Sequence, residues 1–123
     1  MKEHNGKVYI ENAPHNMEEL LEIITVLRSP EGCSWDRAQT HESLKECLTE
    51  ESEEVLQAID KQDDENLCEE LGDLLMQVLV HCEIAKERGA FDFSGASSFI
   101  TTHISFIPSF SAHETRQLRA SLV

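Results

Sequence analysis

Acidic side chains recur at short intervals in two parts of the chain that otherwise show the pattern of amphipathic helices. Glu50, Glu51 and Glu54 lie in the first part, and Glu70 and Asp73 lie in the second. Carboxylate oxygens are the ligands that Mg²⁺ prefers, and an ion held by them can offset the charge of a phosphate substrate. If the two parts meet in space, these residues predict a magnesium site, with Mn²⁺ as an alternative ion.

The first group of acids borders the apolar side of a helix predicted over about residues 41–61. The apolar stripe of this helix is formed by Leu44, Leu48, Val55 and Ile59. At about 100° per residue, Glu51 lies at the edge of the stripe, Glu54 one step further round and Glu50 beyond it, whereas Glu53 points the opposite way. Because an unpaired buried carboxylate is costly, a cation is expected to face these acids.

The second group lies on a helix predicted over about residues 65–88. Its apolar stripe is formed by Leu67, Leu71, Leu74, Val78 and Ala85, and a polar seam beside it by Glu70, Asp73, Gln77 and His81. Two antiparallel helices joined by a short turn would bring both groups of acids together. The alternative is a solvated acidic surface, and for Glu53, Glu65 and Glu69 we favour that interpretation.

The remaining segments divide the chain into an arm, a helical domain and a tail. Residues 1–15 are predicted to form a loose N-terminal arm, and residues 16–93 a helical domain whose first helix starts at Asn16 and stops before Pro30. Residues 33–40 are predicted to form a loop, and Gly89 to end the last long helix. The Ser-rich residues 94–123 lack a clear period and are predicted to be irregular.

The composition and charge of the chain exclude some classes of binding partner and indicate its compartment. The chain has 123 residues and a formal net charge of −14, which argues against nucleic acid or an anionic membrane as the main partner. No run of apolar residues is long enough to span a bilayer, and the first residues lack the apolar core of a secretory signal. The four cysteines show no C-x-x-C pair and no paired Cys/His spacing. Because a secretory signal is also missing, we expect reduced thiols in a cytoplasmic protein.

The acidic segments, together with a motif upstream of them, resemble the MazG family of nucleoside triphosphate pyrophosphohydrolases. The acids meet the family pattern E-E-x-x-E followed by E-x-x-D. The upstream segment LRSPEGCSWDRAQTH, residues 27–41, is similar to the family's LR-x-P-x-G-C-P-W-D-x-x-Q-T-H, with Ser34 in place of the usual Pro. The resemblance covers about residues 17–94.

The resemblance implies an all-α fold in which helical hairpins assemble into a four-helix-bundle-like homodimer, or a dimer of dimers. It implies hydrolysis of nucleoside triphosphates at the α–β phosphate bond, giving the monophosphate and pyrophosphate. By this resemblance Glu51, Glu54, Glu70 and Asp73 would bind the metal. Glu50 would hold or deprotonate the attacking water.

Substrate contacts are expected from three residues near the start of the hairpin. Trp35 could stack on a base or could cover the helix pair, and Arg37 and Lys45 could contact phosphate or serve as surface charges. His41 is expected in hydrogen bonds at the helix start, and His81 in the helix interface. After residue 94 the chain departs from the family pattern, so the alternative function is a catalytically weak, nucleotide-binding oligomeric module.

Overall fold

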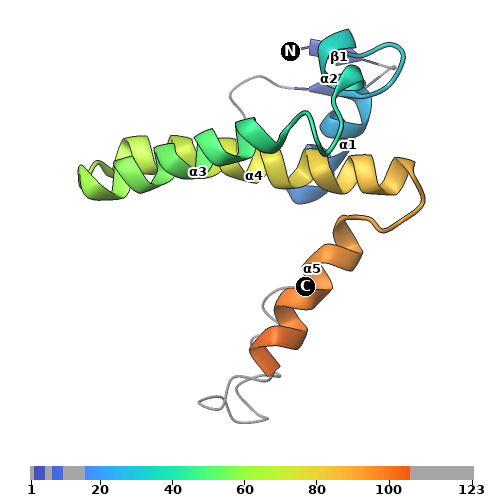
Figure 1. Ribbon diagram of the computed structural model, residues 1–123. Helices are drawn as coiled ribbons and strands as arrows, with labels where there is room; N and C mark the ends of the chain where they lie inside the picture. The colour runs from blue at the N-terminus through green and yellow to red at the C-terminus, as the bar shows by residue number, and fades with distance from the viewer. Residues whose placement is uncertain (1, 5–6, 10–15, 106–123) are drawn as a thin grey trace. The chain divides into compact units, whose positions relative to one another are not determined.

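The structure, a computed structural model, describes residues 2–4, 7–9 and 16–105. Within these residues it contains the helices α1 (Met17–Leu27), α2 (Ser34–Ala38), α3 (Lys45–Asp60), α4 (Asp64–Glu87) and α5 (Phe93–Ser105), and the strands β1 (Lys2–His4) and β2 (Lys7–Tyr9) (Figure 1). The predicted all-α class is confirmed for the helical body. The chain divides after Ile84 into two compact units. None of the described helices combines the length and apolar character needed to cross a bilayer.

Local sequence signals determine where α1 begins and how the chain turns back after it. The Asn16 side chain accepts a hydrogen bond of 2.8 Å from the backbone N–H of Glu19, which is the predicted N-terminal cap. After the helix, Gly32 turns back so closely that a Cβ there would overlap the carbonyl oxygens of Val26 and Leu27. Glycine is therefore required at this position.

The segment predicted as a loop over residues 33–40 contains the short helix α2, so that prediction was incomplete. The following helix begins later than predicted, at Lys45. Residues 41–44 before it form a turn that begins with reciprocal hydrogen bonds, as in a capping box: the N–H of Thr40 donates to Ser43 Oγ at 2.8 Å, and the N–H of Ser43 donates to Thr40 Oγ1 at 3.1 Å. The N–H of Leu44 also donates to the Thr40 carbonyl at 3.1 Å, so this turn leads directly into the helix.

Helices α3 and α4 form an antiparallel hairpin (Figure 1). Between them Gln62 adopts a positive φ of 55°, and Asp63 accepts a hydrogen bond from the N–H of Asn66 that caps the start of α4. Gly89 has a φ of 74° just after α4, as predicted for a glycine that ends a helix.

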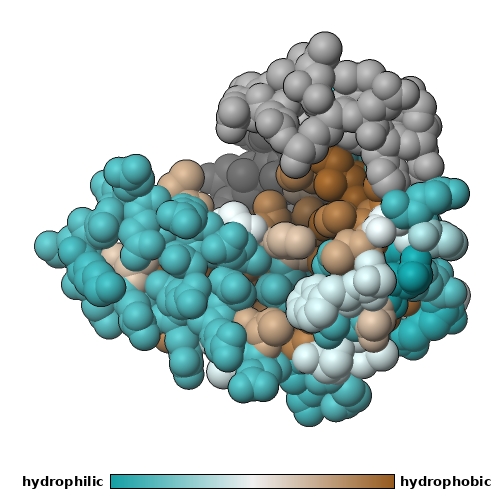
Figure 2. All heavy atoms as spheres, turned by 90° about the horizontal axis from the view of Figure 1, so that it is seen from above, coloured by the Kyte–Doolittle hydropathy of each residue, from teal (hydrophilic) through white to brown (hydrophobic). Residues whose placement is uncertain are grey.

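The buried hydrophobic residues lie on α1, on α3 and the residue before it, and on the C-terminal half of α4. They are Ile24, Leu44, Val55, Ala58, Leu79, Val80, Cys82, Ile84 and Ala85. The predicted stripes are therefore only partly correct, since four of their members are exposed, namely Leu48, Ile59, Leu71 and Val78. A two-helix hairpin covers only one side of each helix, so part of each apolar face is left exposed. Hydrophilic side chains cover most of the described surface visible in Figure 2, with hydrophobic side chains among them.

The prediction of an irregular tail from residue 94 is wrong for residues 94–105, which belong to α5. The Asp92 side chain accepts a hydrogen bond of 2.9 Å from the N–H of Gly95 and so caps this helix. Hydroxyl groups that would favour other conformations bond instead within the helix, as Ser98 Oγ does to the carbonyl of Gly95 at 2.8 Å. The predicted irregularity of residues 106–123 lies outside the described residues.

The N-terminal arm contains an antiparallel strand pair that we did not predict. Lys2 pairs with Tyr9, and His4 with Lys7. The Asn5-Gly6 dipeptide between the strands in the sequence is a signal typical of tight hairpin turns, and it would have predicted the pairing.

Candidate metal centre

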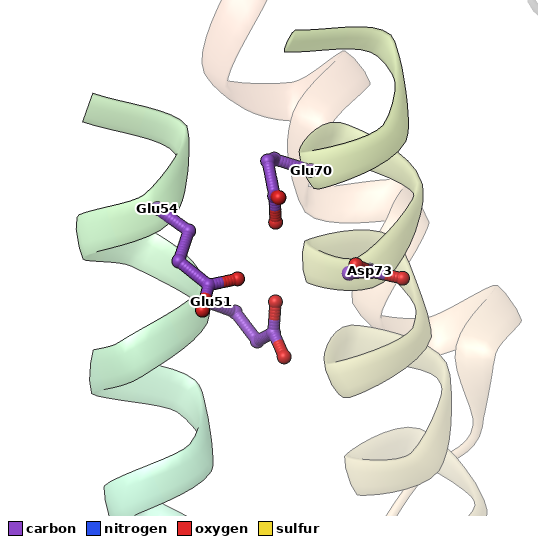
Figure 3. A group of neighbouring side chains, drawn as sticks. All are labelled: Glu51, Glu54, Glu70 and Asp73. Atoms are coloured by element: carbon purple, nitrogen blue, oxygen red, sulfur yellow. The ribbon is translucent and has the colours of Figure 1, made fainter. Parts of the chain in front are cut away.

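Four acids from the hairpin lie close together (Figure 3). Glu51 and Glu54 come from α3, and Glu70 and Asp73 come from α4. Each offers one carboxylate oxygen, and these four oxygens all lie within 4.8 Å of one another. Residues three apart on a helix share a face, so two antiparallel helices are sufficient to gather all four groups, which we call the carboxylate cluster.

Burial and mutual repulsion perturb the acids of the cluster. Burial raises the pKa of Glu51, and the negative charges of Glu54 and Asp73 raise it further. A side-chain hydrogen bond with Glu54, together with burial and the nearby charges, raises the pKa of Glu70 to about 7. Two carboxyl groups can share a hydrogen bond only if one of them holds a proton, so the cluster keeps a proton near neutral pH.

The carboxylate oxygens of the cluster are the type of ligand that a hard divalent cation prefers. Oε2 of Glu51 and Oε2 of Glu70 are buried and have no hydrogen-bond partner within the described part of the chain. A cation bound among the acids would satisfy these two atoms and offset the repulsion. Oxygen ligands of this kind suit Mg²⁺ or Mn²⁺ rather than a soft metal. The residues present therefore fit the predicted metal.

Glu50 lies outside the carboxylate cluster. Its side chain is exposed on α3, and its charge contributes to the raised pKa of Glu51. The three acids for which a surface role was favoured, Glu53, Glu65 and Glu69, are all exposed and outside the cluster.

The predicted substrate residues occupy the segment before α3 and its first turn. Trp35, on α2, is 60% exposed. Arg37 donates through Nη1 to the carbonyl oxygens of Ser29 at 3.2 Å and Pro30 at 2.9 Å, so part of its guanidinium organises this segment. Lys45 is exposed and forms a surface ion pair with Glu42 at 3.6 Å. A contact of these three residues with substrate stays a prediction.

Sequence reasoning did not anticipate that His41 and His81 would pair. Their Nδ1 atoms are 2.8 Å apart and their rings are nearly parallel, with centroids 5.1 Å apart and 4° between the planes. Burial, followed by the neighbouring His41, lowers the pKa of His81. The antiparallel arrangement that sets Glu51 near Asp73 also brings these two histidines together, and no local sequence pattern records that pairing.

Three curated relatives each match between 60% and 71% of the chain. It is 61% identical over 74 residues to the nucleoside triphosphate pyrophosphohydrolase/pyrophosphatase MazG of Thermotoga maritima, covering 60% of this chain and 29% of the relative. It is 42% identical over 88 residues to the nucleoside triphosphate pyrophosphohydrolase of Escherichia coli, covering 71% of this chain and 34% of the relative. A third relative, the uncharacterized protein YabN of Bacillus subtilis, is 48% identical over 77 residues, which are 63% of this chain and 16% of that protein. The chain thus spans about a third or less of these relatives.

A family model described as the MazG nucleotide pyrophosphohydrolase domain matches residues 39–104, more than half of the chain. The matched range contains the whole carboxylate cluster and Lys45, while Trp35 and Arg37 precede it. It also runs to the penultimate residue of α5, beyond the point at which we expected the family resemblance to end. The chain therefore belongs to the MazG nucleotide pyrophosphohydrolase domain family.

Proposed function

We propose that this protein hydrolyses nucleoside triphosphates, ribo- or deoxyribo-, at the α–β phosphate bond. The observation that carries the proposal is the carboxylate cluster, whose four oxygens lie within 4.8 Å of one another on two helices. The substrate class is supported by the names of the Thermotoga maritima and Escherichia coli relatives, which are nucleoside triphosphate pyrophosphohydrolases. The reaction class is the hydrolysis of an acid anhydride.

Glu51, Glu54, Glu70 and Asp73 would hold Mg²⁺, with Mn²⁺ as a substitute. A bound divalent ion offsets the charge of the phosphates and lowers the pKa of a bound water. The proposal is supported by the position of all four acids on helices, which are a more rigid support for such chemistry than a loop. Glu70 must give up its proton when the cation is bound, because a carboxyl group ligates through its ionised form.

Glu50 is proposed to hold or deprotonate the attacking water. It is exposed, so it is open to solvent and substrate, and it is next in sequence to the ligand Glu51. The water oxygen bonds to the α-phosphorus, and the bond from that phosphorus to the bridging oxygen breaks. Pyrophosphate leaves with the electron pair of the broken bond, and a proton of the water passes to Glu50. The products are a nucleoside monophosphate and pyrophosphate.

Trp35, Arg37 and Lys45 are proposed to hold the substrate. The largely exposed ring of Trp35 can stack on a nucleobase. Arg37 and Lys45 supply positive charge in a chain whose net charge is −14, and that charge would favour an anionic triphosphate.

We further propose a cytoplasmic homodimer or dimer of dimers. Large apolar side chains are exposed on both helices of the hairpin, including Leu56 on α3 and Leu75 and Met76 on α4. A second copy of the chain offers the same faces and could bury them, as in four-helix bundles. The four cysteines are all free thiols, which fits a reducing compartment.

Product analysis in ¹⁸O-labelled water tests the reaction. With Mg²⁺ we expect a monophosphate and pyrophosphate, and we expect the label in the monophosphate because water attacks the α-phosphorus. A diphosphate and inorganic phosphate would contradict the proposed bond. Metal-dependent nucleotide binding without turnover would instead support the alternative, a catalytically weak nucleotide-binding module.

A further inference from the structure

Several hydrogen bonds hold residues 29 to 43 together, and we call this stretch the Trp35 segment. Arg28 Nη1 donates to the carbonyl oxygens of Asp36 at 2.6 Å and Gln39 at 3.0 Å, and so links the end of α1 to the middle of this stretch. Gln39 Nε2 donates to the Trp35 carbonyl at 3.0 Å, and Ser43 Oγ donates to Gln39 Oε1 at 2.8 Å. A constraint on one residue of the Trp35 segment therefore restrains Trp35 as well.

His41 lies within the Trp35 segment, between the two residues that bond reciprocally at its end. Its partner His81 is on α4, 40 residues further along the chain, and the Nδ1 atoms are 2.8 Å apart. His81 lies about two turns, or roughly 12 Å along the helix axis, beyond the cluster residue Asp73. The pair thus joins the Trp35 segment to the helix that carries two acids of the carboxylate cluster.

The geometry of the pair requires one ring to donate a hydrogen bond and the other to accept it. One Nδ1 donates its hydrogen and the other accepts it, so at least one of the rings is neutral at that atom. Both rings are half-buried, so water has limited access to the hydrogen bond between them. A hydrogen bond in such a setting contributes to the free energy that keeps its two elements together.

We propose that the His41–His81 pair is a positioning device that holds the Trp35 segment on α4 and thereby sets how firmly a nucleotide is held beside the carboxylate cluster. The role in nucleotide binding rests on the proposed function, whereas the hold on the Trp35 segment does not. Both histidines are positioning residues, because they act through Trp35 and its neighbours. Their loss should weaken substrate binding and leave the cleavage step almost unchanged.

Two substitutions separate the hydrogen bond from the ring. His81→Phe keeps an aromatic ring at this position and removes the hydrogen bond. His81→Asn removes the ring but places an amide group where Nδ1 was, and an amide can donate to or accept from His41. If the hydrogen bond is the operative contact, His81→Asn restores what His81→Phe loses.

Fluorescence tests the hold on the Trp35 segment without any need for activity. Trp35 is the only tryptophan in the sequence, so the anisotropy of its emission reports the mobility of this segment. We expect lower anisotropy in His81→Phe than in the wild type, and recovery in His81→Asn. Unchanged anisotropy in His81→Phe, or equal values in the two variants, would overturn the proposal.

Steady-state kinetics test the consequence for nucleotide binding. In His81→Phe we expect the KM for a nucleoside triphosphate to rise roughly three- to tenfold, the range for one lost hydrogen bond, with kcat changed by less than about twofold. The double variant His41→Phe/His81→Phe should be no worse than either single one, because all three lack the same bond. A fall in kcat with unchanged KM, or additive losses in the double variant, would contradict the proposal.

The proposal stays testable if a variant does not fold or if the wild type has no pyrophosphohydrolase activity. If His81→Phe does not fold, His41→Phe and His41→Asn make the same comparison from the other ring. If the wild type releases no pyrophosphate, the proposed function fails, and the anisotropy of the variants still decides whether the histidine pair holds the Trp35 segment.

Discussion

Glu53 and Glu54 are adjacent in the sequence but differ in their place on α3, since only Glu54 belongs to the carboxylate cluster. We therefore expect Glu54→Ala to lower kcat/KM by two or more orders of magnitude. A lost metal ligand removes several kcal/mol of transition-state stabilisation, and each 1.4 kcal/mol is about tenfold in rate. Kinetic assays with Mg²⁺ measure the change.

Glu53→Ala is the matched control for that experiment. Its side chain is exposed and outside the cluster, so kcat/KM should stay within about twofold of the wild type. Similar losses in both variants would show that the helix face has been assigned wrongly.

Glu70 is expected to make metal binding depend on pH. Its pKa is about 7 rather than 4.5, so a proton competes with the metal below neutral pH. Calorimetry should show Mg²⁺ affinity falling up to about tenfold per pH unit below 7, with proton release on binding. Glu70→Gln should weaken binding at every pH and remove this slope. A wild-type affinity that is constant between pH 6 and 8 would contradict the assignment.

The same raised pKa affects the stability of the metal-free protein. Glu70 binds its proton more tightly when folded, so its contribution to stability is fully present below pH 4.5 and is lost as the pH rises through 7. Without Mg²⁺, the Tm should therefore fall over this range by more in the wild type than in Glu70→Gln.

At the scale of elements, the α3–α4 hairpin brings together acids that repel one another, and metal binding should relieve that repulsion. A ligand at 100 times its Kd stabilises the folded state by about 2.7 kcal/mol. Asp73 raises the pKa of both Glu51 and Glu70 through its charge. Asp73→Asn should accordingly raise the Tm of the metal-free protein and shrink the increase that Mg²⁺ causes.

Thermal melts with and without Mg²⁺ measure both effects. Glu69→Gln, which removes a charge from an exposed position of the same helix, serves as the control and should keep the wild-type increase. If Asp73→Asn also keeps the full increase, Asp73 is not a metal ligand.

The turn after α1 depends on the missing side chain of Gly32. A Cβ at this position would overlap two backbone carbonyl oxygens of α1, so Gly32→Ala should destabilise the protein by about 1–3 kcal/mol. Gly72→Ala is the matched control, because nothing lies within 4 Å of its added Cβ. In the interior of α4 this change should raise stability by roughly 0.5–1 kcal/mol. Denaturant titrations measure the free energy of unfolding of both variants. Equal changes at the two positions would show that the turn does not require glycine at position 32.

At the scale of the whole molecule, the exposed apolar side chains of the hairpin predict self-association. Light scattering at micromolar concentration should give at least twice the chain mass of 13.9 kDa. Met76→Glu places a charge on the exposed apolar face of α4 and should lower the mass towards that of one chain, while Glu69→Gln should not. A wild-type monomer would contradict the proposed assembly.

Local sequence patterns were sufficient to determine the main helices and the side of each helix on which the acids lie. The cap at Asn16, the breakers after α1 and the glycine at position 89 act through neighbouring backbone groups, so they can be recognised without the fold. The positions of Glu51, Glu54, Glu70 and Asp73 on their helices follow from 3.6 residues per turn. The segment from 94 to 105 escaped prediction because its many Ser and Thr residues obscure the period, although Asp92 supplies a cap for the first turn of α5.

Only the tertiary structure decided which helix faces meet. The antiparallel arrangement of α3 and α4 brings two pairs of acids to within 4.8 Å, and it joins His41 to His81. It also leaves Leu71 and Val78 exposed while burying Leu79 and Val80, which the apolar pattern alone does not distinguish. Periodicity is a property of one helix, but burial and pairing depend on the helix opposite. The relative placement of two helices is set by packing between residues far apart in the sequence.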